Sequence, residues 1–209
     1  MLKDITIMDL NILGIYITDY AATFSIREIT IKLSINYSHA FKRIKRLIKQ
    51  GILTEKKRGQ ANEVAFNIRN MDAVQMLCFV EEQESRQLQN SSLRLIAKEA
   101  IQIDPLACIG LFGSRVSGKA VKTSDWDVFI IAQKSKISQM NKIMNKFPHV
   151  RNIQMQAFSI EEFEESLLSA EETVVKHIAR NKRIVYNPHP FYSIIQMWEK
   201  VKYAPSQTN

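Results

Sequence analysis

One stretch, residues 111–131, constrains the fold of this chain more than any other. A short apolar run ends in Gly113-Ser114, ten residues follow, and Asp125-Trp126-Asp127 then leads directly into the apolar run Val128-Phe129-Ile130-Ile131. This pattern predicts a strand, a tight turn, a short helix and a second strand. Free backbone N–H groups at the start of that helix would be able to hold phosphate.

The second predicted strand begins with two carboxylates that are two residues apart. Because side chains alternate along a strand, Asp125 and Asp127 should point to one face and Trp126 to the other. Two neighbouring carboxylates repel each other unless a cation lies between them. Oxygen ligands at this spacing suit Mg²⁺, which usually keeps substrate phosphates among its ligands. The alternative is a strand-turn-strand unit with two surface aspartates.

The combination of Gly-Ser, ten residues and Asp-x-Asp resembles the signature of the minimal nucleotidyltransferases in the DNA polymerase β superfamily. Gly118 and Ser124 also fall where that family commonly has Gly and Ser. The resemblance implies a nucleoside triphosphate as substrate or ligand and Mg²⁺ as cofactor. Asp125 and Asp127 would be the metal ligands, and Asp125, Asp127 and Ser114 the catalytic residues. It further implies that the backbone at Gly113 and Ser114 holds the triphosphate. Arg115 follows the turn directly and is predicted to contact phosphate.

The predicted site departs from the family at a third carboxylate, which in this superfamily generally lies on a later strand and activates the attacking hydroxyl. That strand should be residues 151–158, which contain no Asp or Glu. Gln154 and Gln156 are the candidates for the vacant place. An amide offers a neutral oxygen to a metal and cannot act as a base. Glu161 or Glu162 could substitute, although both fit the first turn of a helix, where carboxylates are favourable anyway.

The first seventy residues are the most basic part of the chain, with 12 Lys and Arg against 6 Asp and Glu, in a chain of net charge +8. Helices are predicted at 8–21, from a capping box at Ser25 to about residue 33, and at 37–50, closed by Gly51. Strands are predicted at 52–57 and 63–68. Apolar residues recur at helical spacing in the third helix and are expected to pack inward: Tyr37, Phe41, Ile44, Leu47 and Ile48.

Three helices followed by a basic hairpin resemble a winged helix-turn-helix domain, which implies double-stranded DNA as a partner. The third helix would enter the major groove, and the hairpin would contact the backbone or the minor groove. A winged helix used only for protein contacts and a solvated charged helix remain alternatives. The predicted DNA-binding residues lie on the third helix and the hairpin: Ser38, His39, Lys42, Arg43, Lys45, Arg46, Lys56, Lys57 and Arg58.

These segments predict an α+β chain in three parts: a winged helix-turn-helix at 1–70, a connector helix at 71–91, and a nucleotidyltransferase-like α/β domain with a small mixed sheet at 92–209. Ser91 or Ser92 should cap the helix that opens the last part. Another helix is predicted at 136–147. A long helix after a winged domain makes a homodimer one possible arrangement, and a spacer helix is the other.

Other classes of protein are disfavoured by the composition. The two cysteines, Cys78 and Cys108, form no CxxC pair, and the four histidines are scattered, so neither a disulfide framework nor a zinc site is expected. No apolar run approaches the length needed to span a membrane, and no signal-peptide layout is seen. The expected location is therefore the cytoplasm, with no membrane partner.

Two interpretations of function remain open from the sequence. In the first, the chain is a DNA-binding transcriptional regulator whose nucleotidyltransferase-like domain binds Mg-nucleotide, with activity reduced by the missing carboxylate. In the second, it is an active, antitoxin-like transferase that moves a nucleoside monophosphate to a protein acceptor such as a HEPN-type toxin. Whether the chain is an enzyme is thus left undecided.

Overall fold

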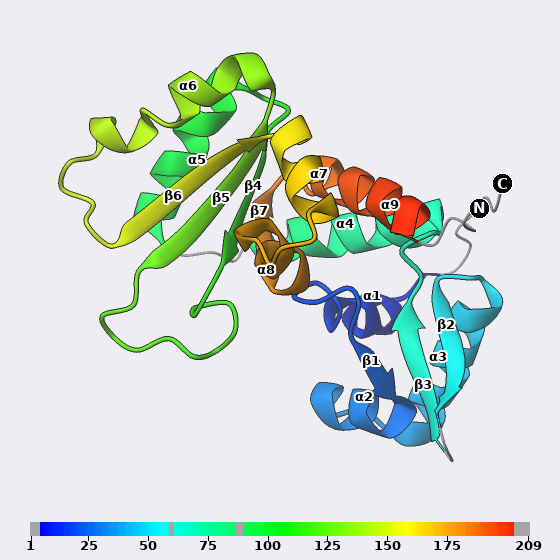
Figure 1. Cartoon of the computed structure of the whole chain (residues 1–209). Coiled ribbons are helices and arrows are strands. Elements are labelled where there is room, and N and C mark those ends of the chain that lie inside the picture. Colours follow the sequence, from blue (N-terminus) through cyan, green and yellow to red (C-terminus); the bar gives the residue numbers. More distant parts are fainter. Residues whose placement is uncertain (1–4, 59–60, 87–89, 203–209) are drawn as a thin grey trace, which may run out of the picture. The chain divides into compact units, whose positions relative to one another are not determined.

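The computed structural model describes residues 5–58, 61–86 and 90–202 (Figure 1). The chain divides into two compact units, Met1–Glu81 and Glu82–Asn209. The boundary lies inside helix α4, Met71–Ser85, which covers most of the segment predicted to connect the two domains. Residues 87–89, at the end of the predicted connector, lie outside the described residues.

The first unit combines helices with a three-stranded antiparallel sheet in the order β1-β3-β2. Strands β2 and β3 form the expected hairpin, although residues 59 and 60 of its turn lie outside the described residues. The elements that precede α4 are α1 (Ile7–Gly14), β1 (Thr23–Ser25), α2 (Ile26–Leu33), α3 (Tyr37–Lys49), β2 (Leu53–Arg58) and β3 (Ala61–Phe66).

Side-chain caps set where the helices of this unit begin. The predicted capping box at Ser25 is confirmed: its hydroxyl accepts from the backbone N–H of Glu28, and the Glu28 carboxylate accepts from the N–H of Ser25. The Asn36 side chain caps α3 in a similar way. Helix α3 ends before Gly51, whose φ of +74° suits a residue without a side chain.

The predicted helix at 8–21 is wrong in its second half. Helix α1 ends at Gly14, and the chain turns into β1, which pairs with β3. Buried Tyr16 explains part of this change, because its hydroxyl donates to the Val64 carbonyl oxygen on β3 at 3.0 Å. A contact between residues so distant in the chain gives no local periodic signal.

The prediction for the inner face of α3 is correct only in part. Ala40, Ile44 and Leu47 are buried, but Tyr37 is 52% exposed and Phe41 is 40% exposed. The buried arc is centred on the small Ala40, so the two aromatic residues lie at its margin and face solvent. On β3 and just beyond it, Val64, Phe66 and Ile68 are all buried, as the alternation predicted.

The second unit is built on a mixed four-stranded sheet in the order β6-β5-β4-β7, which confirms the predicted α+β class with a small mixed sheet. Strands β5 and β6 are parallel, while β4 pairs antiparallel with both β5 and β7. The elements are α5 (Ser91–Ile103), β4 (Cys108–Phe112), β5 (Trp126–Ala132), η1 (Lys134–Lys136), α6 (Ile137–Met140), η2 (Ile143–Lys146), β6 (Ile153–Ser159), α7 (Ile160–Leu168), α8 (Val174–Arg180), β7 (Lys182–Tyr186) and α9 (His189–Lys202).

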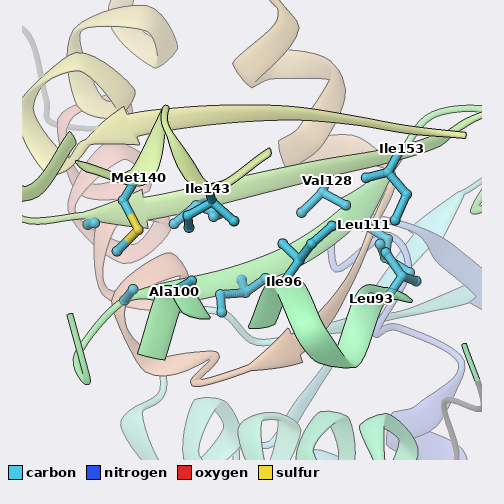
Figure 2. Close-up of a cluster of buried hydrophobic side chains, with 12 residues drawn as sticks. Leu93, Ile96, Ala100, Leu111, Val128, Met140, Ile143 and Ile153 are labelled. Atoms are coloured by element: carbon cyan, nitrogen blue, oxygen red, sulfur yellow. The ribbon is translucent and has the colours of Figure 1, made fainter. Parts of the chain in front are cut away.

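Helices cover both faces of this sheet. Helix α5 packs on one face, and its buried Leu93, Ile96 and Ala100 meet side chains of β4, β5 and β6 (Figure 2). Helices α7 and α9 lie over the other face, where Phe163 and Phe191 are fully buried (Figure 1). In place of one helix at 136–147, the chain forms the short α-helix α6 between two 3-10 turns, η1 and η2. Asn90, rather than Ser91 or Ser92, caps α5.

A buried ion pair joins α1 to α3 in the first unit. Asp9 is 1% exposed, and the Arg43 guanidinium donates to both of its carboxylate oxygens, with Nε to Oδ1 at 2.8 Å. Burial alone would raise the pKa of Asp9, but hydrogen bonds from Arg43 and Thr6 and the guanidinium charge outweigh it and lower the pKa. The pair therefore stabilises the fold above the ordinary pKa range of a carboxyl group, and this stabilisation is lost as the pH falls.

Replacing Arg43 by Met should lower the free energy of unfolding by about 3 kcal/mol at neutral pH, because Asp9 would be left buried without its cation. The loss should shrink in acid, where Asp9 becomes protonated. Urea denaturation followed by circular dichroism measures both effects. Lys42→Met, at an exposed neighbouring position, is the control and should change stability by less than about 0.5 kcal/mol. Equal losses in the two variants would contradict the role assigned to the pair.

Candidate functional site

The two halves of the predicted site meet where β4 ends and β5 begins. Strand β4 pairs with β5 so that Phe112 lies opposite Asp127, and Gly113 turns the chain away with a φ of +76°. A Cβ atom added to Gly113 would lie only 2.0 Å from Oδ2 of Asp127. The backbone of the Gly113-Ser114 turn thus packs directly against a carboxylate, and only glycine leaves room for it.

Asp125 and Asp127 form an electrostatically coupled pair at the start of β5. Partial burial, and then the charge of Asp125, raise the pKa of Asp127 above its ordinary value. Trp126, between them, packs against the core cluster on the α5 side of the sheet. The pair offers the hard oxygen ligands that Mg²⁺ prefers, and a bound cation would relieve the repulsion.

Strand β6 places an amide beside this pair. Gln154 lies opposite Asp127 in the parallel register, and its Nε2 donates to Oδ2 of Asp125 at 2.8 Å. Gln156, the other candidate, pairs with Phe129 further along the strand. The donated hydrogen bond compensates part of the Asp125 charge without adding a negative one.

No third acidic ligand completes the site within the part of the chain that the structure describes. That part contains no group of three or more His, Cys, Asp or Glu side chains able to hold a metal ion. The Glu162 carboxylate caps α7 instead, accepting from the backbone N–H of Ser159 at 2.8 Å. Two carboxylates, with water and phosphate oxygens, fit one Mg²⁺ ion but leave a second ion short of charged ligands.

The Arg115 side chain is held against its own loop. Its guanidinium donates to the carbonyl oxygens of Ser124 and Asp125 and stacks on Trp126, with Cζ 4.6 Å from the ring centre. The predicted helix after Ser114 is wrong, because this segment forms turns, closed for example by a hydrogen bond from Lys119 N–H to Ser114 O at 2.9 Å. Arg115 stabilises the loop that carries the aspartates, and its contact with phosphate stays a prediction.

The predicted DNA-binding residues differ in their exposure and in their partners within the first unit. Arg43 pairs with Asp9, and Lys45 Nζ lies 2.8 and 2.6 Å from the carboxylate oxygens of Glu55, so both cations are partly neutralised inside the first unit. Arg46 is half-buried, and the side chain of Arg58 lies outside the described ones. The exposed members are Ser38, His39, Lys42, Lys56 and Lys57.

Sequence reasoning did not single out a buried cation close to the site. Lys182 lies opposite Phe112 on β7, is 0% exposed, and donates from Nζ to the Tyr192 hydroxyl at 2.6 Å. Its ammonium group also lies over the rings of Phe191 and Tyr192, at 5.2 and 4.7 Å. A lysine at the start of a short strand is expected to be exposed, so nothing in the sequence indicated that Lys182 is buried.

Comparison with known proteins bears on the second unit. Residues 95–190 match the family model described as "Polymerase beta, Nucleotidyltransferase". This match covers a little under half of the chain and includes the Gly-Ser turn, both aspartates and Gln154. It supports a nucleotidyltransferase domain in the second unit. A search of curated proteins finds no match to the chain. Among the described helices, none is long and apolar enough to cross a membrane.

Two glycines between β4 and β5 test the packing of the turn against the carboxylate. Gly113 and Gly118 both have positive φ, but an added Cβ would strike Asp127 only at Gly113 and would meet nothing within 4 Å at Gly118. Gly118→Ala should cost about 1 kcal/mol for its left-handed backbone alone. Gly113→Ala should cost clearly more, because the carboxylate must also move. Chemical denaturation compares the two variants, and equal costs would argue against a tight turn–carboxylate contact.

Proposed function

We propose that this chain is a DNA-binding transcriptional regulator whose nucleotidyltransferase domain binds Mg-nucleotide. The domain would transfer the nucleoside monophosphate to an acceptor only poorly. The hydrogen bond from Gln154 to Asp125 carries this proposal, since it puts an amide where catalysis calls for a third carboxylate. The double-stranded DNA partner, the nucleotide ligand and the Mg²⁺ ion are all parts of the proposal.

Nucleotide binding is supported by the residues around the Gly-Ser turn. Asp125 and Asp127 would hold Mg²⁺, and the backbone at Gly113 and Ser114 would lie beside the phosphates. When bound, Mg²⁺ supplies positive charge to the triphosphate and helps the pyrophosphate to leave. The raised pKa of Asp127 fits such a role, because a carboxylate that ionises reluctantly alone gains most from a cation.

Weak transfer follows from the chemistry of Gln154. An amide nitrogen that donates to Asp125 cannot take a proton from an acceptor hydroxyl, and its carbonyl oxygen brings no charge to a metal. General-base assistance typically contributes 10²–10⁴-fold to a rate. A site without it would retain the ligand and lose most of the turnover.

The first unit supports the DNA-binding part of the proposal. Helices α2 and α3 are joined by a short turn, and the β2-β3 hairpin follows them, which is the order of elements in a winged helix-turn-helix. Exposed Lys42 on α3 and exposed Lys56 and Lys57 on β2 would contact phosphates. A homodimer bound to paired half-sites is compatible with this arrangement.

The contact between Gly113 and Asp127 is compatible with a second candidate function. It places a carboxylate directly beside the turn that would hold the phosphates, as transfer requires no less than binding. In this alternative the domain is an active, antitoxin-like transferase that moves a nucleoside monophosphate to a protein acceptor, such as a HEPN-type toxin. Acceptor and DNA binding could coexist in one chain.

The nucleotide site is tested by titrating the protein with Mg-ATP and with the Mg complexes of CTP, GTP and UTP, using isothermal calorimetry. Asp127→Asn should weaken binding of the preferred nucleotide on the order of tenfold, equivalent to about 1.4 kcal/mol. Glu165→Gln, a matched carboxylate-to-amide change at an exposed position, should leave affinity unchanged. Binding that is equally strong in all three proteins would place the nucleotide elsewhere or exclude it.

Transfer is measured with labelled nucleotides, with and without candidate acceptor proteins. The wild type should show little transfer, and Gln154→Glu should raise it, roughly 100-fold if the new carboxylate acts as a base. Asp125→Ala and Asp127→Ala in the Gln154→Glu background should abolish the gain. Strong transfer by the wild type that disappears in the aspartate variants would instead establish the second candidate function.

DNA binding is tested by measuring duplex affinity as a function of salt. A Lys42→Ala, Lys56→Ala, Lys57→Ala variant should bind more weakly, and its salt slope should fall by about 0.9 for each lost phosphate contact. Lys98→Ala, an exposed lysine of the second unit, is the control for a simple change of charge. An unchanged affinity and salt slope in the triple variant would refute the assignment.

A further inference from the structure

Helix α3 presents two large aromatic side chains to solvent at its N-terminal end. Tyr37 is 52% exposed and Phe41 is 40% exposed, and their rings stack with centroids 6.1 Å apart and planes inclined by 27°. Single exposed apolar residues are common on protein surfaces and need no explanation. A stacked pair on a helix whose exposed face is otherwise polar points to a contact with a partner.

The pair is held in place from its other side. Lys45, one turn further along α3, has its Nζ 5.6 Å from the centre of the Phe41 ring. The same ammonium group bonds to Glu55 on β2, so it is fixed between a carboxylate and the ring. Phe41 is therefore bounded by Tyr37 and Lys45 and forms a pre-organised apolar ledge, with little side-chain entropy left to lose on binding.

The surroundings of this ledge are basic and polar. Ser38 and Lys42 are exposed on the same helix, and the sequence of α3 contains no Asp or Glu. A partner that matches the ledge must combine negative charge with small apolar groups. Duplex DNA does so in its major groove, where the C5-methyl group of thymine lies among base edges flanked by phosphates. Duplex RNA does not, because its major groove is too narrow for side chains.

We propose that Tyr37 and Phe41 contact thymine methyl groups in the major groove, so that the chain prefers duplexes with thymine at the contacted positions. This inference rests on the proposed DNA-binding function and adds the chemical feature that is read. Lys42 and the hairpin lysines would position α3 on the backbone, and the aromatic ledge would supply the selectivity for bases.

The experiment replaces the methyl group in the DNA as well as the ring in the protein. An alternating dA·dT duplex and the matching dA·dU duplex differ only in the thymine methyl groups. At low salt, fluorescence anisotropy should show that the wild type loses about fourfold in affinity for each methyl group removed from contact. Phe41→Ala, and separately Tyr37→Ala, should each reduce this preference, and the double variant should bind the two duplexes almost equally.

The control is Met71→Ala, which removes a side chain of the same unit that is 60% exposed but lies on α4. This variant should keep the full preference for dA·dT, and circular dichroism checks that each variant is folded. A wild type that binds both duplexes equally, or ring variants that keep its preference, would overturn the inference while leaving DNA binding intact, as expected if the ledge binds a protein. Failure of the wild type to bind any duplex at low salt would overturn the proposed function as well.

Discussion

The repulsion between Asp125 and Asp127 is the physical constraint on which the second unit's site depends. Two carboxylates at the start of one strand destabilise the fold unless their charge is compensated. Partial burial, and then the charge of Asp125, raise the pKa of Asp127. The chain supplies partial compensation through the Gln154 amide and braces the preceding loop with Arg115, which bonds to the carbonyl oxygens of Ser124 and Asp125. A bound cation would complete this compensation, and the proposed binding of Mg-nucleotide rests on that requirement.

Much of the architecture was readable from the sequence because the signals were local. The spacing from Gly113-Ser114 to Asp125-Trp126-Asp127 predicted two adjacent strands, and β4 and β5 are those strands. Capping chemistry at Ser25 located the start of α2. The missing third carboxylate was also readable from the sequence, since residues 151–158 contain no Asp or Glu.

The features that escaped prediction depend on contacts between distant residues or on the width of a helix face. The loop after Ser114 was expected to be helical, but the Arg115 side chain donates hydrogen bonds to residues nine and ten positions later in the chain. Helical spacing grouped Tyr37 and Phe41 with the core, although the buried arc of α3 is centred on Ala40, Ile44 and Leu47. Arg43 looked like a DNA contact, and only the fold revealed buried Asp9 as its partner.

Buried Lys182 has a consequence for how the second unit can be shortened or fused. Its ammonium group lies on β7, at the edge of the four-stranded sheet, and its hydroxyl partner and both aromatic rings come from the first turn of α9. Without that turn, a positive charge would be left against apolar side chains with fewer groups to solvate it. Helix α9 thus supplies the groups that stabilise the buried ammonium of Lys182. A shortened domain that ended with β7 would lack these groups.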